Sequence, residues 1–216
     1  ICNMNKSIIR YILGHVFLLT SCLMLLPALV GLIYLEHEAV AYLIVASACF
    51  LSGFIMTRNK PENTTLYLKE GCISTSLAWI LLSLIGCLPF FVTGEIPSFT
   101  DALFETISGF TTTGASILAN VEGLSHCSLL WRSFTHWIGG MGAIVPLSGG
   151  SNINLMRAES PGPSVGKLVP KMKYTARILY IIYFGLTLIQ FILLIIGRMP
   201  VFDAVCTAFG TAGTGG

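Results

Sequence analysis

Five long apolar runs contain no Asp, Glu, Lys or Arg, and they restrict this chain more than any other feature. A helix needs about 20 apolar residues to cross a hydrocarbon core of about 30 Å. The composition, with 54% hydrophobic and 10% charged residues and a mean hydropathy of +0.81, excludes a soluble domain with a mostly polar surface. The sequence therefore predicts an all-α integral membrane protein. The five runs are Tyr11–Leu35, Ala39–Thr57, Gly71–Gly94, Ser133–Met156 and Ile178–Gly197.

The charged residues between the runs predict an orientation in the membrane. Cytoplasmic loops carry an excess of Lys and Arg. If the N-terminus is inside and each run crosses once, ten of the twelve basic residues fall inside: Lys6, Arg10, Arg58, Lys60, Lys69, Arg157, Lys167, Lys171, Lys173 and Arg177. The outer side then collects Glu36, Glu38, Glu95, Asp101, Glu122 and Asp203. These acidic residues either attract cations to an outer mouth or are simply solvated loop charges.

A Phe-x-Thr-x-Gly pattern occurs twice, as Phe110–Gly114 and as Phe209–Gly213. Each copy follows an apolar run, a turn with a proline and an Asp-Ala pair. The spacing is not identical, since Asp101 lies nine residues before Phe110 and Asp203 six before Phe209. The repetition predicts an old duplication of a unit made of an apolar helix, a short helix, a Thr/Gly loop and a return helix.

The repeated unit divides the chain into four parts. Residues 1–69 are expected to form a leading transmembrane hairpin with a cytoplasmic loop, and residues 70–150 the first helix–pore loop–helix repeat around a pore. The second repeat, 177–216, is expected to stop after its loop, which indicates a fragment. Between them, 151–176 is expected to be a cytoplasmic linker, because the Pro and Gly residues of Ser148–Lys173 disfavour a helix of any length.

Smaller elements of the first repeat are also predicted. A short helix is expected over Asp101–Gly109, capped by Ser98 or Thr100. The return helix should start near Ser128. Three glycines near its end, Gly139, Gly140 and Gly142, indicate either close helix packing or a flexible gate.

The Thr/Gly loops suggest selective passage of a monovalent cation. Backbone carbonyls can replace the water around such an ion without trapping it. Glycine permits the unusual dihedral angles that turn carbonyls inward, which accounts for Gly114 and Gly213. Phe110 and Phe209 would pack the loops against helices. The predicted ligands are the carbonyls of Thr111, Thr112, Thr113, Gly114, Gly210, Thr211, Ala212 and Gly213.

Three other functions were compared with this interpretation. A tetrameric potassium channel would be expected to carry TVGYG in its filter, and neither loop does. An intramembrane enzyme could use His15, His126 or His136, but the chain has no G-x-S-x-G or HExxH motif. A purely structural membrane subunit would not need paired Thr/Gly loops. The sequence thus predicts a transporter and not an enzyme.

Four stretches resemble the Trk/Ktr/HKT superfamily of potassium uptake proteins, and most closely its bacterial TrkH branch. They are Asp101–Ser116, Trp131–Gly142, Leu155–Pro163 and Phe202–Gly216. The resemblance implies one pore built from four repeats in a single chain. It makes Thr111–Gly114 and Gly210–Gly213 two quarters of the selectivity filter. Glycine at position 114 favours potassium in this superfamily, whereas serine there accompanies sodium transport.

The resemblance also implies partners and a location. It implies a homodimer, a cytoplasmic nucleotide-binding ring that regulates gating, contact with membrane lipid and no nucleic acid. The expected location is the bacterial inner membrane, with the N-terminus inside. Potassium is the transported ion, and neither a cofactor nor a metal site beyond the monovalent cation sites is expected. The chain departs from the family because the third and fourth repeats are absent and the stretch near Val145-Pro146 is short.

Overall fold

The computed structural model describes residues 5–61, 68–142 and 169–215, and its regular elements in these ranges are all α-helices. The prediction of an all-α protein is therefore confirmed. The helices are α1 (Lys6–Ile33), α2 (Ala39–Arg58), α3 (Leu68–Gly86), α4 (Leu88–Thr93), α5 (Phe99–Phe110), α6 (His126–Met141), α9 (Val169–Ile196) and α10 (Val201–Ala212). Four segments are long and apolar enough to cross a membrane, namely Lys6–Ile33, Ala39–Arg58, Lys69–Thr93 and Arg177–Ile196.

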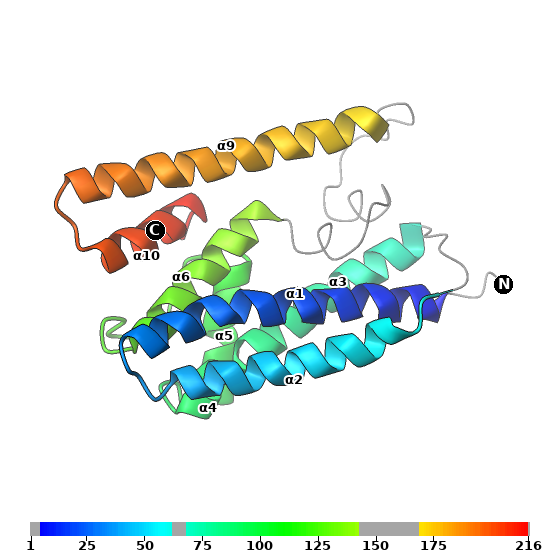
Figure 1. The fold of residues 1–216 in the computed structure, drawn as a ribbon, viewed down its shortest axis with the longest axis horizontal. Helices are drawn as coiled ribbons and strands as arrows, with labels where there is room; N and C mark the ends of the chain where they lie inside the picture. The colour runs from blue at the N-terminus through cyan, green and yellow to red at the C-terminus, as the bar shows by residue number, and fades with distance from the viewer. Residues whose placement is uncertain (1–4, 62–67, 143–168, 216) are drawn as a thin grey trace.

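Helices α1 and α2 form the predicted leading hairpin and lie side by side along most of their length (Figure 1). Their backbones approach closely where Gly14 faces Gly53, since a Cβ added to Gly53 would lie 2.8 Å from the Gly14 carbonyl oxygen. At the start of α1, the Asn5 side chain accepts a hydrogen bond from the Ile8 N–H at 3.3 Å. Small residues such as Gly14 and Gly53 allow the backbones of two membrane helices to approach this closely.

The sequence had indicated one apolar run over Gly71–Gly94. In the structure this run is divided into two helices. Helix α3 ends at Gly86, and α4 begins at Leu88 with Pro89 in its first turn. Proline lacks the N–H that a continuous helix would bond four residues back, so a break before it is expected. The buried indole of Trp131 donates a hydrogen bond to the Gly86 carbonyl at the end of α3, at 2.9 Å.

Helices α5 and α10 are each 12 residues long, too short to cross a membrane. Helix α5 starts two residues before the predicted Asp101 and ends at Phe110. Its N-cap is Ser98, as predicted, whose side chain accepts a hydrogen bond from the Asp101 N–H. An aspartate occupies the first turn of both helices, where the positive end of the helix dipole favours it.

The helices are ordered through the molecule as α2, α1, α6, α10 and α9, each packed on the next (Figure 1). Helix α5 packs on α6 and α3. Helix α6 thus packs against both short helices, α5 and α10. It begins at His126, two residues before the predicted start, and its N-cap is Ser125.

Two other predictions concern the linker and the fourth apolar run. Helix α9 begins at Val169, so the end of the predicted linker Ser148–Lys173 is helical. Pro170 does not oppose this, because a proline is tolerated in the first turn of a helix. The fourth apolar run is helical from Ser133 to Met141. Its later part, with most of the linker and the Val145-Pro146 stretch, lies outside the described residues, and the division into domains stays a prediction.

Hydrogen bonds between distant segments join basic helix ends at one end of the bundle and acidic loops at the other. At one end of the bundle the Arg10 guanidinium donates to the Asn59 carbonyl at 3.4 Å, which joins the basic ends of α1 and α2. At the other end Glu36 binds His126 and Glu95 binds Ser125, which joins the acidic loops. The short helices α5 and α10 both start at this acidic end (Figure 1).

Candidate functional site

The first Thr/Gly loop begins with a tight turn at the end of α5. The Thr111 N–H donates to the Ile107 carbonyl, the Thr112 N–H to Gly109 and the Thr113 N–H to Ser108, at 2.9–3.0 Å. Thr112 has a φ of 55° and Gly114 a φ of 74°, so two residues take the left-handed conformation. The unusual dihedral angle predicted for Gly114 is therefore confirmed.

The second loop starts later than the sequence indicated. Helix α10 continues through Ala212, so Gly210, Thr211 and Ala212 lie in its last turn and not in a loop. The prediction for Gly213 is also wrong, since its φ is −77°. The left-handed residue is instead Thr214, with a φ of 57°. The helix extends through Gly210 and Thr211 although neither is a strong helix former, so the second copy of the Phe-x-Thr-x-Gly pattern does not mark a helix end.

The two helix ends nevertheless have the same backbone hydrogen bonds, with every residue number raised by 102. Gly213 donates to Phe209, Thr214 to Thr211 and Gly215 to Gly210, at 2.9–3.0 Å. The counterparts of Thr111, Thr112 and Thr113 are therefore Gly213, Thr214 and Gly215. By the same offset Asp203 corresponds to Asp101, and both begin an Asp-Ala pair.

The carbonyl oxygens of Thr111, Thr112, Thr113 and Gly114 accept no hydrogen bond from the described part of the chain, and neither do those of Gly213 and Gly215. In contrast, the Gly210 and Thr211 carbonyls are engaged by Gly215 and Thr214. The Thr111 hydroxyl donates to the Ile107 carbonyl at 2.7 Å and lies 2.8 Å from the Thr113 hydroxyl. These hydroxyls brace the loop while its carbonyls stay available to a ligand.

The two loops lie against each other. A Cβ added to Gly114 would lie 2.7 Å from the Gly215 carbonyl oxygen and 3.1 Å from its carbon. Any side chain at Gly114 would therefore displace the second loop, in addition to the strain of a positive φ. The fold thus brings together two segments that are about 100 residues apart and that the sequence had paired only by pattern.

Helix α6 contacts the end of α5 and the second loop at points that leave no room for side chains. A Cβ on Gly139 would overlap the Phe110 carbonyl, and one on Gly213 would overlap the His136 carbonyl. A Cβ on Gly140 would lie 2.6 Å from the Tyr183 hydroxyl of α9. Close packing is therefore confirmed for Gly139 and Gly140. Gly142, with a φ of 58°, is the C-cap of α6.

Aromatic side chains hold both helix ends in place. Phe110 is 3% exposed and meets Trp79 and Trp131 edge to face, with ring centroids 6.3 and 6.4 Å apart. Phe209 lies 5.5 Å from Phe134 and 5.3 Å from Trp137. The predicted packing role of both phenylalanines is confirmed.

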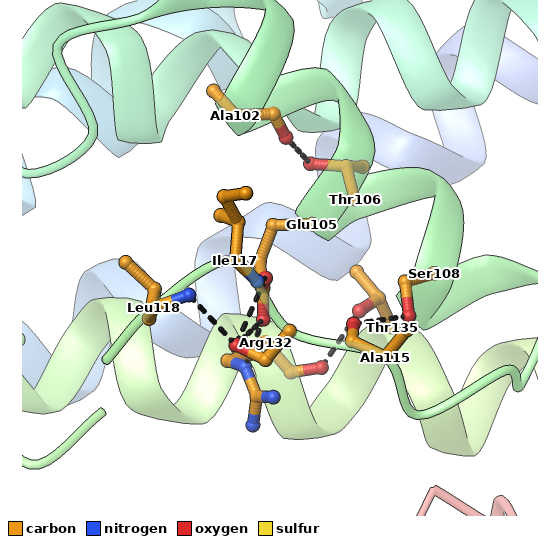
Figure 2. Close-up of polar contacts among 10 residues, drawn as sticks. Ala102, Glu105, Thr106, Ser108, Ala115, Ile117, Leu118, Arg132 and Thr135 are labelled. Carbon is orange, nitrogen blue, oxygen red and sulfur yellow. Dashed lines mark hydrogen bonds and ion pairs between the residues drawn. The ribbon is translucent and has the colours of Figure 1, made fainter. Parts of the chain in front are cut away.

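A buried ion pair supports the chain that leaves the first loop (Figure 2). Glu105 of α5 is 2% exposed and pairs with Arg132 of α6. The same carboxylate accepts hydrogen bonds from the Ser116 hydroxyl and the Ile117 N–H, all at 3.1 Å. Sequence analysis did not identify Glu105 as a functional residue. The signal available was an acidic residue on a short apolar helix, four positions after Asp101.

A cavity of about 430 Å³ lies between α6 and α10 beside the second loop. Its lining carries both signs of charge and includes Glu122, Arg132, His136, Asp203 and Gly215. Among the described residues no group of three or more His, Cys, Asp or Glu side chains could hold a metal ion. Polar groups on both sides of this space therefore lie beside the second loop, at Gly215.

Two carboxylates from other segments hold the start of α6. Glu36 accepts hydrogen bonds from the His126 N–H at 2.8 Å and the Cys127 N–H at 3.1 Å, and Glu95 accepts one from the Ser125 N–H at 2.6 Å. Burial alone would raise the pKa of Glu36. The hydrogen bonds from His126 and Cys127 outweigh burial, so this pKa lies below its ordinary value of 4.5. The negative charges also suit a helix N-terminus.

Comparisons with known proteins agree on one family. The TrkH family model, described as cation transport protein, matches residues 36–216. The Trk system potassium uptake protein TrkH of Salmonella typhimurium is 37% identical over 223 residues, which cover 99% of this chain and 46% of that protein. The Trk system potassium uptake protein TrkG of Escherichia coli K12 is 35% identical over 225 residues, with 99% and 46% coverage.

A solved structure gives the same result for the fold. The potassium transporter TrkH from Vibrio parahaemolyticus superposes with a TM-score of 0.79 at 30% identity, and the match covers 95% of this chain and 42% of that one. The chain therefore spans about half the length of the curated relatives it matches.

Proposed function

Because the chain belongs to the TrkH family of cation transport proteins, we propose that it contributes two filter loops to a potassium uptake pore. The family is one of multi-pass membrane transporters and not of enzymes. One observation carries the proposal: two loops with the same backbone hydrogen bonds meet at Gly114 and Gly215, and the described residues donate no hydrogen bond to their carbonyl oxygens. Such oxygens can replace the hydration shell of a potassium ion.

The proposed ligands are the carbonyls of Thr111, Thr112, Thr113 and Gly114 in the first loop. In the second loop the 102-residue offset favours Gly213, Thr214 and Gly215 over the originally predicted Gly210, Thr211 and Ala212. The carbonyls of Gly210 and Thr211 already accept hydrogen bonds that close the helix end. Only Gly213 belongs to both sets.

The transport mechanism follows from charge and shape. Cations gather at the acidic outer end of the bundle, where Glu122 and Asp203 line the cavity beside the loops. They lose water at the ring of carbonyls and move inward with the membrane potential, which contributes about 2.3 kcal/mol per charge per 100 mV. The short helices α5 and α10 bring the chain to membrane depth, and the loops return it in a protein-lined cavity.

The proposal includes an orientation and partners. The basic ends of α1 and α2 face the cytoplasm of a bacterial inner membrane, with the N-terminus inside. A homodimer and a gating ring that binds nucleotides follow from the resemblance and stay predictions. A sodium-permeable or non-selective transporter of the same family is the alternative, because the first loop alone does not determine the selectivity of a complete pore.

The test is uptake of rubidium, as a potassium substitute, into vesicles that contain the full-length protein, with sodium as competitor. We compare the parent with Gly114→Ser. The matched control is Gly94→Ser, because Gly94 has the same left-handed backbone, with a φ of 76°, and no atom within 4 Å of an added Cβ. Both variants place a side chain on a left-handed backbone, but only Gly114→Ser displaces the second Thr/Gly loop.

Selective rubidium uptake by the parent and by Gly94→Ser, with discrimination against sodium lost in Gly114→Ser, supports the proposal. Equal rubidium and sodium uptake by the parent would favour the non-selective alternative. No uptake of either ion by a folded parent would favour a structural role.

A further inference from the structure

We propose that Glu105 is a positioning residue that sets ion discrimination by fixing the outgoing end of the first loop. The inference rests on the proposed function, since it concerns the geometry of the same carbonyls. Glu105 contacts none of the proposed ligands. It acts through Ser116 and Ile117, which follow the loop, and through Arg132 on the return helix.

The four residues Thr111–Gly114 are held at both ends. At the incoming end, three backbone hydrogen bonds close the last turn of α5. At the outgoing end, the Ser108 hydroxyl donates to the Ala115 carbonyl at 2.6 Å, and Glu105 accepts from the next two residues (Figure 2). A segment fixed at both ends has little freedom to change the spacing of its carbonyls.

The Glu105 carboxylate supports the loop exit strongly because most of its acceptor positions are occupied. It receives a hydroxyl, a backbone N–H and a guanidinium N–H, and hydrogen bonds to a charged acceptor are the strong ones. Burial prevents water from substituting for these donors. The loop exit is exposed at Ala115, Ser116 and Ile117, and the other side-chain hydrogen bond to it from the described residues comes from Ser108 to the Ala115 carbonyl.

The ion pair also determines the charge near the cavity. Arg132 lines the space beside the second loop, and Glu105 balances its positive charge. Loss of Glu105 therefore has two separable effects: it frees the loop exit, and it leaves an unbalanced cation where potassium passes. The preference for rubidium over sodium measures the freed loop exit, and the total uptake rate measures the unbalanced positive charge.

The experiment measures rubidium uptake by the full-length protein in vesicles and its inhibition by sodium, for four variants. Glu105→Gln removes the charge and weakens the hold on the loop exit. Glu105→Gln combined with Arg132→Gln removes both charges and leaves no unbalanced ion. Ser116→Ala removes the hydroxyl that donates to Glu105 and accepts from the Leu118 N–H, at an exposed residue, and keeps the ion pair. Glu95→Gln is the matched control, a carboxylate that holds the start of α6 and touches neither loop.

We expect the preference for rubidium over sodium to fall by about tenfold in Glu105→Gln and in the double variant, the scale of a lost hydrogen bond to a charged group. A smaller fall of the same sign is expected in Ser116→Ala, which should fold normally. The double variant should recover uptake rate relative to Glu105→Gln without recovering discrimination. Glu95→Gln should lower stability and leave discrimination unchanged.

Unchanged discrimination in Ser116→Ala together with unchanged discrimination in either folded Glu105 variant overturns the inference. If Glu105→Gln does not fold, unchanged discrimination in Ser116→Ala alone overturns it. The proposed function is judged separately, by selective uptake in the parent and its loss in Gly114→Ser.

Discussion

Thr112 and Thr214 lie 102 residues apart and share one backbone conformation, with φ values of 55° and 57°. Each donates its N–H to the carbonyl three residues earlier, at 3.0 Å. A β-branched residue in the left-handed region is strained, and such strain concentrates at functional sites. The same strained residue at the same point of two helix ends indicates that both loops need this turn.

Relief of that strain should stabilise the protein and reduce its ion discrimination. Thr112→Gly removes about 1–2 kcal/mol of left-handed strain but frees the loop. We expect a melting temperature in detergent that is unchanged or higher, with weaker preference for rubidium over sodium. Leu35→Gly is the control, since Leu35 has a φ of 58° in the exposed α1–α2 loop. A loss of discrimination in that control would refute the assignment of the effect to the filter.

The second loop should respond at Gly215 and not at Thr211. Gly215→Ala would bring a Cβ to 2.5 Å from the His136 ring and move a proposed ligand, so discrimination should fall severalfold. Thr211 is exposed in the last turn of α10, and Thr211→Ala should change discrimination little. Competitive uptake of rubidium and sodium measures both. If Thr211→Ala lowers discrimination and Gly215→Ala does not, the ligands are the residues predicted from the Phe-x-Thr-x-Gly pattern.

The helix contacts made by glycine should tolerate no extra methyl group. Gly139→Ala forces a Cβ into the Phe110 carbonyl, and overpacking of this kind costs about 1–3 kcal/mol. Gly185→Ala is the matched control in α9, where an added Cβ has no neighbour within 4 Å. Thermal unfolding in detergent should show a clear loss for the first and no loss for the second. Equal melting temperatures would contradict the close packing of α6.

The hydrogen bonds that Glu36 accepts at the start of α6 should weaken in acid. The pKa of Glu36 is lower in the folded protein than its ordinary value of 4.5, so folding favours the charged form. Its contribution, about 1–2 kcal/mol for a helix cap, is complete above pH 4.5 and is lost as the pH falls through the lowered pKa. Melting temperatures measured at falling pH should show this loss in the parent, and Glu36→Gln should show a smaller one. An identical acid dependence in both would contradict the assigned role.

The sequence was sufficient to predict four of the five apolar runs as segments of membrane-spanning length, because length and hydropathy decide whether a segment can span lipid. It also identified the first loop, where a helix end, a positive φ and the pattern all coincide at Phe110–Gly114. The second loop was misplaced by three residues, because the pattern matched Phe209 while the helix continued to Ala212. The signal was available: Asp101 lies nine residues before Phe110, but Asp203 only six before Phe209.

Long-range polar contacts could not be predicted in the same way. The ion pair between Glu105 and Arg132 and the cap from Glu36 on His126 join residues 27 and 90 positions apart. Hydropathy and local pattern carry no information on which helices become neighbours. Only the packed arrangement shows that one carboxylate serves both a loop exit and a return helix.

The glycine contacts of α6 fix how closely its backbone lies to the end of α5 and to the second loop. The backbone of α6 meets the Phe110 carbonyl at Gly139 and meets Gly213 at the His136 carbonyl, with no side chain between. Side chains can rotate and yield, but a helix backbone has a fixed diameter. The spacing of these backbones therefore does not depend on any side-chain rotamer.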